Sequence, residues 1–308
     1  MVDIDTFLTI LYVMVDDYFK SHPASERRSG PSASLTCSEV VTLTLFGQWC
    51  RFTSERDFYR YARNHLRDAF PDLPDRAQFN RLMRRHAEAV TACFLHLVQL
   101  LDAQRCSYEA LDGTAAVTRD AKRRGSGWLP GLADIGWSNR LGWYEGFDVL
   151  LSVNPIGAIT GFGFGSASTK DQPLAETFFA LRAYPDPRLA TVGTPAQGPY
   201  VTDKGFEGEA RHRDWQDAYG AVVICAPKRS SRHPWPRAWR RWLAGIRQIV
   251  ETVNGSLQHV FRLDRERPHS LDGFQVRLAA KMALHNFCIW LNRQLGRAPL
   301  AFADLVAW

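Results

Sequence analysis

The chain has 308 residues, of which 45% are hydrophobic and 23% are charged, and it carries a formal net charge of +6. This balance is typical of a globular protein with ample material for one large domain or two modest ones. No apolar run is long enough to span a bilayer, and the N-terminus lacks the basic region of a signal peptide. The six cysteines form no CxxC pair, so we expect reduced thiols in a cytosolic protein and no zinc module.

The positive charge is unevenly distributed. Residues 1–100 hold 12 basic and 12 acidic side chains, whereas the remaining 208 residues hold 26 and 20. The segment 228–241, KRSSRHPWPRAWRR, contains six basic residues, two tryptophans and no acid. A basic segment interleaved with aromatic residues suits contact with phosphates and bases, and a solvated surface loop is the alternative. Charge alone does not separate these interpretations.

Residues 1–100 have helical periodicity. SLTCSEVVTLTLFGQW predicts a helix capped by Thr36 or Ser38. An amphipathic helix is predicted over 54–70, where two prolines follow, and one longer helix over 76–101.

Three arginines lie on one side of the longer predicted helix. Residues three and four apart on a helix are neighbours, so these cations form one surface. Such a surface suits a helix-turn-helix reader of DNA, and a plain helical packing or dimerisation domain is the alternative. The predicted DNA contacts here are Arg81, Arg84 and Arg85.

From residue 107 strand-like runs replace the helical pattern. The predicted strands are YEALDGTAAV, GFDVLLSVNP, GAITGFGFG, GPYVTDKGF and YGAVVICAPK. A helix is predicted over 171–184, a short one before the fifth strand, and a long one over 239–261. Three sequential strands followed by strand–helix alternation indicate an α/β or α+β fold with a mixed sheet flanked by helices.

Three acids occupy comparable places in these elements. Asp112 ends the first predicted strand, Asp203 ends the fourth, and Glu251 lies on the long helix at the edge of its apolar stripe. Two strand-end aspartates and a helix glutamate suit a site for two Mg²⁺ ions, with Asp112 bridging both. The alternatives are turn residues beside glycines, and a surface pair between Glu251 and Arg247.

Aromatic residues in and after the basic segment divide into two groups. Two prolines exclude a regular helix around Trp235, which leaves its ring free to stack on an unpaired base. Trp239 and Trp242 follow the apolar stripe of the long helix, so we expect both in the core and expect Trp242→Ala to destabilise the fold. The predicted DNA contacts in the segment are Lys228, Arg229, Arg232, Trp235 and Arg237.

The motifs ALDGT, VTDKGFEG and RQIVETVNGSL together resemble the three acidic motifs of DDE-type transposases from bacterial insertion sequences. The similarity extends to flanking segments and covers nearly the whole chain. It implies an RNase H-like catalytic domain over 105–308, preceded by an all-α domain over 1–104 that binds DNA ends. By matching position, the catalytic and metal-binding triad would be Asp112, Asp203 and Glu251.

The resemblance also implies partners and cofactors. Arg247 matches a basic residue that many of these enzymes carry one turn before the glutamate, and Lys204 is a further candidate DNA contact. One large group of the family has a tyrosine and a lysine where this chain has Ala244 and Gln258, so those phosphate contacts do not carry over. The expected cofactor is Mg²⁺, as two ions, with Mn²⁺ able to substitute.

The implied activity is metal-dependent cleavage and strand transfer at insertion-sequence ends. The expected partners are the double-stranded DNA of the terminal inverted repeats and of the target, bound by a homodimer or larger assembly. The expected location is the bacterial cytoplasm, at the nucleoid and away from membranes. Alternatives are a stand-alone RNase H-like nuclease, a helix-turn-helix regulator without catalysis, and a glycosidase-like hydrolase, which fits the acids but not the basic segment.

Overall fold

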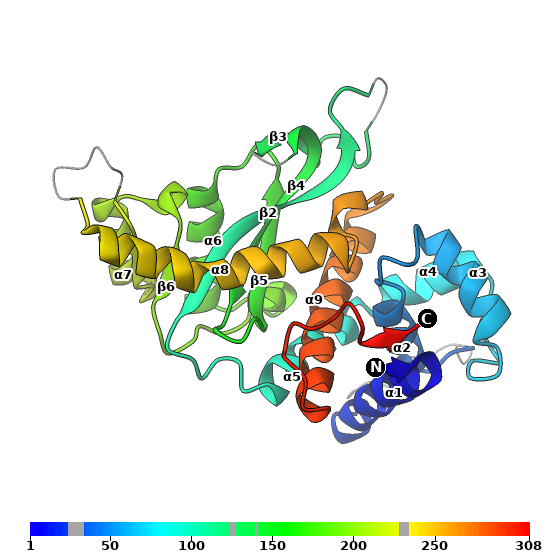
Figure 1. Ribbon diagram of the computed structural model, residues 1–308. Coiled ribbons are helices and arrows are strands. Elements are labelled where there is room, and N and C mark those ends of the chain that lie inside the picture. The colour runs from blue at the N-terminus through cyan, green and yellow to red at the C-terminus, as the bar shows by residue number, and fades with distance from the viewer. Residues whose placement is uncertain (24–33, 124–126, 139–140, 228–233) are drawn as a thin grey trace. The chain divides into compact units, whose positions relative to one another are not determined.

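The computed structural model describes residues 1–23, 34–123, 127–138, 141–227 and 234–308 (Figure 1). Their contacts form two compact units. The first unit comprises Met1–Leu97, Val260–Arg262 and Ser270–Trp308, and the second comprises Val98–His259 and Leu263–His269. The C-terminal segment therefore belongs with the N-terminal helices, whereas the predicted division at residue 104 grouped it with the sheet.

The first unit is helical, as predicted. Its helix α2 begins with a capping box, in which Thr36 and Glu39 each bond the other's backbone N–H. Two-residue strands β1 (Val2–Asp3) and β8 (Val306–Ala307) pair in parallel beside the helices. The helices are α1 (Ile4–Ser21), α2 (Cys37–Phe46), α3 (Glu55–His65), α4 (Arg76–Arg85), α5 (Ala87–Leu100) and α9 (Leu271–Gln294).

The prediction of one helix over 76–101 was wrong, because the helix is interrupted at His86, between α4 and α5. The His86 N–H bonds the carbonyls of Leu82 and Arg84 and closes α4, and the His86 carbonyl accepts the N–H of Val90 as α5 begins. Backbone hydrogen bonds thus continue through the break. The apolar periodicity changes little there and gives no sign of it.

Helix α9 is the centre of the first unit and packs against α2 and α4. Two of its charged residues are buried: Lys281 Nζ donates to Gln48 Oε1 (2.8 Å), and Arg277 Nη1 donates to Glu55 Oε1 (2.6 Å). The N-terminal helices thus share their core with a helix from the other end of the chain. A fragment that ends near residue 100 would lose that helix.

The second unit contains the sheet. Its strands are β2 (Glu109–Asp120), β3 (Asp134–Ser138), β4 (Gly142–Val153), β5 (Ile159–Ser166), β6 (Tyr200–Thr202) and β7 (Val223–Cys225). Its helices are α6 (Asp171–Ala183), α7 (Glu209–Tyr219) and α8 (Arg237–His259), with 3-10 turns η1 (Pro187–Val192), η2 (Lys204–Phe206) and η3 (Leu263–Arg265).

The strand order confirms the predicted fold class. The sheet runs β3-β4-β2-β6-β7, and β5 also pairs with β4. Strand β2 is antiparallel to β4, β4 is antiparallel to β5, and β2, β6 and β7 are parallel. If β3 is left out and β2, β4, β5, β6 and β7 are numbered 1 to 5 along the chain, the strands lie in the order 3-2-1-4-5. This is the strand order of the RNase H-like fold. Strand β3 was not predicted; it and β5 pair with successive parts of β4 along one edge.

The two faces of the sheet carry different helices. Leu111 of β2 packs in a core with Phe178 of α6 and Trp215 of α7. On the other face, Val201 of β6 packs with Leu243 of α8. Successive strand residues point to opposite faces, so the neighbour of Leu111, Asp112, points to the α8 face. None of the described helices is long and apolar enough to cross a membrane.

A fully buried ion pair joins α6 to the start of β2. Arg182 Nη1 donates to Glu109 Oε2 (2.7 Å) and to the Tyr200 hydroxyl (2.9 Å). Its Nη2 donates to Ser152 Oγ and its Nε to the Val192 carbonyl, both at 2.7 Å. Every nitrogen of the guanidinium is therefore bonded, which makes this buried charge tolerable.

Candidate active site

Asp112 and Asp203 come from neighbouring parallel strands. The register pairs Glu109 with Tyr200 and Ala110 with Val201, so two residues further on Asp112 stands beside Asp203. Asp203 caps the turn η2, where Oδ1 accepts the N–H of Gly205 (2.7 Å). The prediction that Asp112 ends its strand was wrong. It lies within β2, at the point where pairing with β6 stops and pairing with β4 continues.

Arg247 lies between two of the predicted acids. Its Nη2 is 3.8 Å from Asp112 Oδ2 and 3.9 Å from Glu251 Oε1. The Arg247 side chain is 16% exposed, whereas that of Glu251 is 48% exposed. Arg247 therefore does not only pair with Glu251 along α8. It also joins the helix to Asp112 on the central strand of the sheet.

A further carboxylate, that of Asp171, belongs to this site and was missed in the sequence. It begins α6, after β5. A Cβ placed on Gly205 would be 2.8 Å from Asp171 Oδ2 and 2.9 Å from Asp203 Oδ1, and one on Gly113 would be 3.3 Å from Asp171 Oδ1. The glycines that follow the two aspartates therefore leave room for Asp171. An acid in the first turn of a helix is common, so its sequence position carried no signal.

Burial raises the pKa values of two of these carboxylates. It raises the pKa of Asp112 to about 7; Arg247 partly opposes that shift and Asp203 adds to it. The pKa of Asp171 is also raised, by burial and then by the charge of Asp203.

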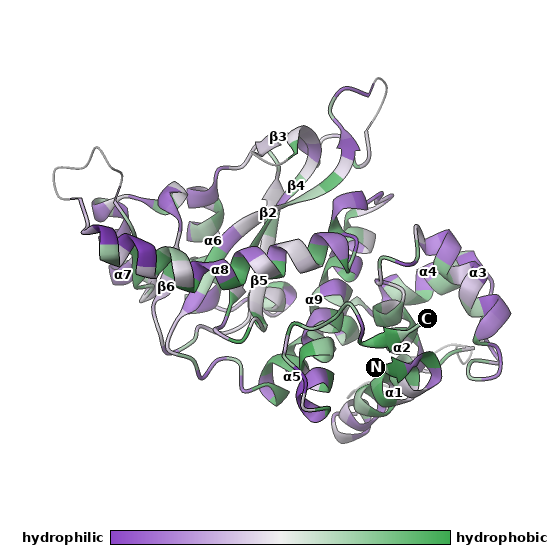
Figure 2. Cartoon of the chain, in the orientation of Figure 1, coloured by the Kyte–Doolittle hydropathy of each residue, from purple (hydrophilic) through white to green (hydrophobic). Residues whose placement is uncertain are grey.

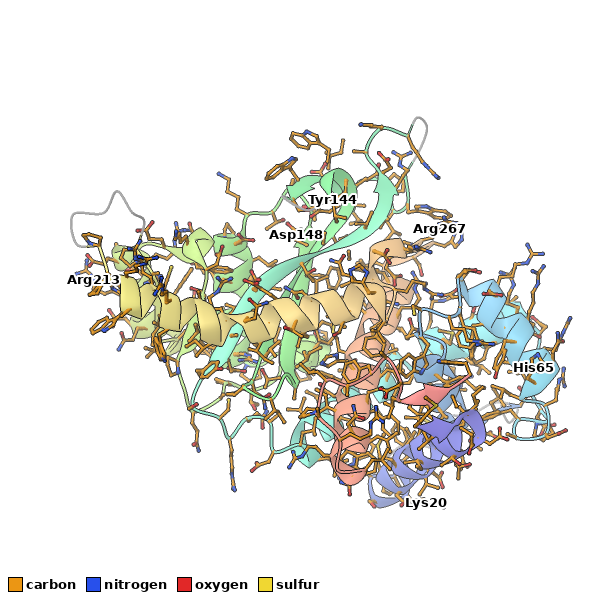
Figure 3. The ribbon with its side chains drawn as sticks, in the orientation of Figure 1. Lys20, His65, Tyr144, Asp148, Arg213 and Arg267 are labelled. Atoms are coloured by element: carbon orange, nitrogen blue, oxygen red, sulfur yellow. The ribbon has the colours of Figure 1, made fainter. Side chains whose placement is uncertain are left out.

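A second strand residue, Asp148, interacts with Asp171 and lies on the α6 face of the sheet, opposite to the face of Asp112. Burial raises the pKa of Asp148 to about 6, the hydrogen bond from the Tyr144 hydroxyl opposes this shift, and the charge of Asp171 adds to it. Tyr144 and Asp148 are four residues apart on the same side of β4 and lie side by side in Figure 3. Because Asp148 pairs with Ala115 of β2, it lies on the same face of the sheet as the Asp171 carboxylate over Gly113.

The donor chemistry of the site fits a hard divalent cation. Its acids offer carboxylate oxygens, which Mg²⁺ prefers, and a cation would relieve the cost of burying these charges. In the parts of the chain that the structure describes, no three His, Cys, Asp or Glu side chains converge closely enough to hold a metal ion. The Arg247 guanidinium instead contacts Asp112 and Glu251.

A basic cavity opens beside Asp203. It has a volume of about 300 Å³, and its lining includes Asp203, Lys204, Arg240 and Arg247. Arg240 also lines an open hollow of about 630 Å³, together with Pro234, Arg237, Arg241 and Ala244. The buried Nε atoms of Arg240 and Arg247 have no hydrogen-bond partner within the described structure. Because both side chains line the cavity, their guanidinium groups can donate to an anion there. Arg240 was not among the predicted contacts.

The tryptophans near the basic segment are placed differently from the prediction. Trp239 and Trp242 are 60% and 59% exposed, so the prediction that both lie in the core was wrong. The buried series of α8 begins only at Leu243; Trp239 lies in the first turn of α8, and Trp242 is rotated by 100° from Leu243. Trp235 is partly buried and packs on Trp239, with ring centroids 6.0 Å apart.

The other predicted DNA contacts are surface residues or lie outside the described ranges. Arg237 is exposed and lines the hollow, whereas Lys228, Arg229 and Arg232 lie outside the described residues. In the first unit, α3 and α4 consist largely of hydrophilic residues, whereas α1 and α2 contain more hydrophobic ones (Figure 2). The exposed residues of α4 include Arg81, Arg84 and Arg85.

The strand order, with aspartates at the central strands and a glutamate on α8, agrees with an RNase H-like protein of the DDE type. Residues 110–287 match the family model described as "Transposase DDE domain". Because the match spans more than half of the chain, the chain belongs to this family of transposase enzymes. No curated protein matches the chain. Among solved structures it is similar to "Mos1 transposase paired-end complex with left transposon end", with 11% identity, a TM-score of 0.23, and 79% of this chain and 83% of that chain covered.

Proposed function

We propose that this transposase cuts DNA at the ends of a bacterial insertion sequence and joins the freed ends to target DNA. The observation that supports the proposal is the position of Arg247 between Asp112 and Glu251, with Asp203 beside Asp112 on the neighbouring strand. In this proposal the three acids hold two divalent ions. Bound Mg²⁺, or Mn²⁺, would make a water molecule nucleophilic and stabilise the leaving oxygen.

The protein's own residues position the DNA. Water attacks the phosphorus, and the 3′ oxygen leaves as a hydroxyl. That hydroxyl then attacks a phosphodiester of the target and displaces the 3′ oxygen of the target strand, which leaves as a hydroxyl. No covalent bond to the protein forms. Arg240, Arg247 and Lys204 line the cavity beside Asp203 and donate to the phosphate being cut. Arg247 balances the charge of Asp112 and Glu251 until the phosphate and its ions arrive.

The test is a joining assay with the purified full chain. A labelled duplex carrying the DNA that flanks the coding sequence is mixed with an unlabelled plasmid, with and without Mg²⁺. We expect cleavage at the ends and transfer of label to the plasmid, both dependent on the ion. Cleavage without transfer would instead identify a nuclease, and binding without either reaction would identify a regulator.

The first prediction concerns Asp171. Asp171→Asn should lower the cleavage rate by about 10- to 100-fold and raise the Mg²⁺ concentration needed for half-maximal activity, because it removes a charge that supports the ligands. Single-turnover cleavage at several Mg²⁺ concentrations measures both effects. Glu176→Gln, on the exposed side of the same helix, is the matched control. An unchanged Mg²⁺ dependence in Asp171→Asn would remove Asp171 from the site.

The second prediction concerns recognition of DNA ends by the first unit. Because α9 completes the core of this unit, the full chain is the appropriate protein. Neutralising the α4 arginines should reduce the preference for an end-containing duplex over a scrambled one, measured by competition binding. The variant carries Ala at Arg81, Arg84 and Arg85. A control variant with the same charge change carries Ala at Arg56, Arg60 and Arg63 of α3. An equal loss of this preference in both variants would mean that the α4 arginines contribute only non-specific positive charge.

The third prediction concerns the basic hollow. Arg237→Ala combined with Arg240→Ala should weaken DNA binding and flatten its salt dependence, by up to ~0.9 in the log–log slope for each phosphate that the variant no longer binds. Binding measured across a series of salt concentrations gives the slope. Arg188→Ala is the control, because Arg188 is exposed and already paired with Asp186 (2.7 Å). If the double variant kept the full slope, the hollow would not be a phosphate site.

A further inference from the structure

An exposed apolar surface lies on the hairpin formed by β3 and β4. In Figure 1, β3 and the adjoining ends of β2 and β4 project beyond helices α6 and α8. Five large apolar side chains of this hairpin, between 39% and 64% exposed, lie within twelve residues: Leu132, Ile135, Trp137, Leu141 and Trp143. We call them the hairpin surface.

One face of the hairpin is buried and the other is exposed, so the exposed side chains are on the face that does not pack against the core. On the inner face Tyr144 is buried in a small core with Ala167, and a Cβ on Gly136 would be 2.7 Å from the Ala167 Cβ. On the outer face Trp137 pairs directly with Trp143 across the strands. Directly opposed side chains are close neighbours in an antiparallel pair. The hairpin thus places two exposed indoles opposite each other on neighbouring strands, away from the core.

Two exposed cations lie close in sequence to the hairpin surface, at the end of the strand that pairs with β4. Its acid Glu145 is paired with Arg119, whose Nε donates to Glu145 Oε2 (2.9 Å). Lys122 and Arg123 are exposed in the turn that follows β2. Of the described residues of 119–145, three are basic and three are acidic, and the acids other than Glu145 are Asp120 and Asp134. Exposed aromatic rings beside cations are the two elements of a binding surface for unpaired nucleotides.

We propose that the hairpin surface binds single-stranded DNA by stacking unpaired bases on Trp137 and Trp143, with Lys122 and Arg123 contacting the phosphates. The inference rests on the proposed function only in so far as cutting a strand frees nucleotides beside the cut. A second copy of the chain fits less well. A symmetric contact would bring the cations of both copies together, and five side chains are few beside the ~20–30 residues that each partner contributes to a stable interface.

The experiment compares two double variants of the full chain. Trp137→Leu with Trp143→Leu keeps an apolar surface and removes the rings, whereas Trp137→Phe with Trp143→Phe keeps aromatic rings. The probes are a fluorescently labelled single-stranded oligonucleotide of mixed sequence and its duplex. We expect the Leu pair to bind the single strand at least about tenfold more weakly, the Phe pair to stay within ~3-fold of the parent, and duplex binding to be unchanged. Both variants should keep the parent melting temperature, because the replaced side chains are exposed.

Two results would overturn the inference. One is single-strand binding by the Leu pair that equals that of the parent. The other is a change of oligomeric state in sedimentation with single-strand binding intact, which would make the hairpin surface a contact between copies. The catalytic proposal is separate: if the parent cuts and joins DNA while the Leu pair binds the single strand normally, only this inference fails. If the parent neither cuts nor joins, the proposed function fails whatever the hairpin binds.

Discussion

Asp112→Asn, Asp203→Asn and Glu251→Gln are each expected to abolish DNA cleavage and joining and to leave DNA binding intact. Each change removes one negative charge with little change of shape. We therefore expect each variant to lose ion binding and to keep its packing. Cleavage of a labelled duplex in Mg²⁺, beside a gel-shift measurement of binding, checks both parts. A variant that retained near-parental strand transfer would take its residue out of the proposed triad.

The stability of the Asp112→Asn variant gives a second, independent test of the role of Asp112. Because burial raises the pKa of Asp112 from 3.8 to about 7, the folded chain binds this proton more tightly than the unfolded chain does. The ionised carboxylate therefore costs stability, and this cost grows as the pH rises from about 4 to about 7. Without divalent ions at pH 8, Asp112→Asn should melt a few degrees higher than the parent. Mg²⁺ should raise the melting temperature of the parent more than that of the variant; the reverse order would contradict an ion at Asp112.

Much of the fold was predictable because its elements have strong local signals. The five predicted strands, α6 and α8 all lie where alternation or helical periodicity placed them. Strand β3 was missed because its outer face is exposed and apolar, so it lacks the alternation of a half-buried strand. Trp242 was misplaced for a related reason: periodicity gives a direction around the helix but does not tell where the sheet beneath it begins.

The candidate site was predictable only in part, since the sequence does not tell which acids have partners. The same strand β2 carries Glu109 and Asp112, three residues apart and on opposite faces. Glu109 is fully buried and bonded to Arg182, so it is structural. Asp112 is exposed to 21% and has Arg247 at 3.8 Å. Arg182 follows Glu109 by 73 residues, and no local pattern links the two.

Arg182→Met is accordingly expected to destabilise the second unit by about 3–5 kcal/mol, because it leaves the Glu109 charge buried without its partner. Urea unfolding followed by fluorescence measures the change. Arg188→Met removes an exposed arginine from a surface pair and should cost no more than about 1 kcal/mol. Adding Glu109→Gln to Arg182→Met should recover part of the loss, since the buried charge is then gone while an amide remains to bond the Thr160 hydroxyl. Equal losses of stability in Arg182→Met and Arg188→Met, or no recovery of stability on adding Glu109→Gln, would contradict this prediction. Glu109 would then not need Arg182 to compensate its buried charge, and it could not be distinguished from Asp112 on that ground.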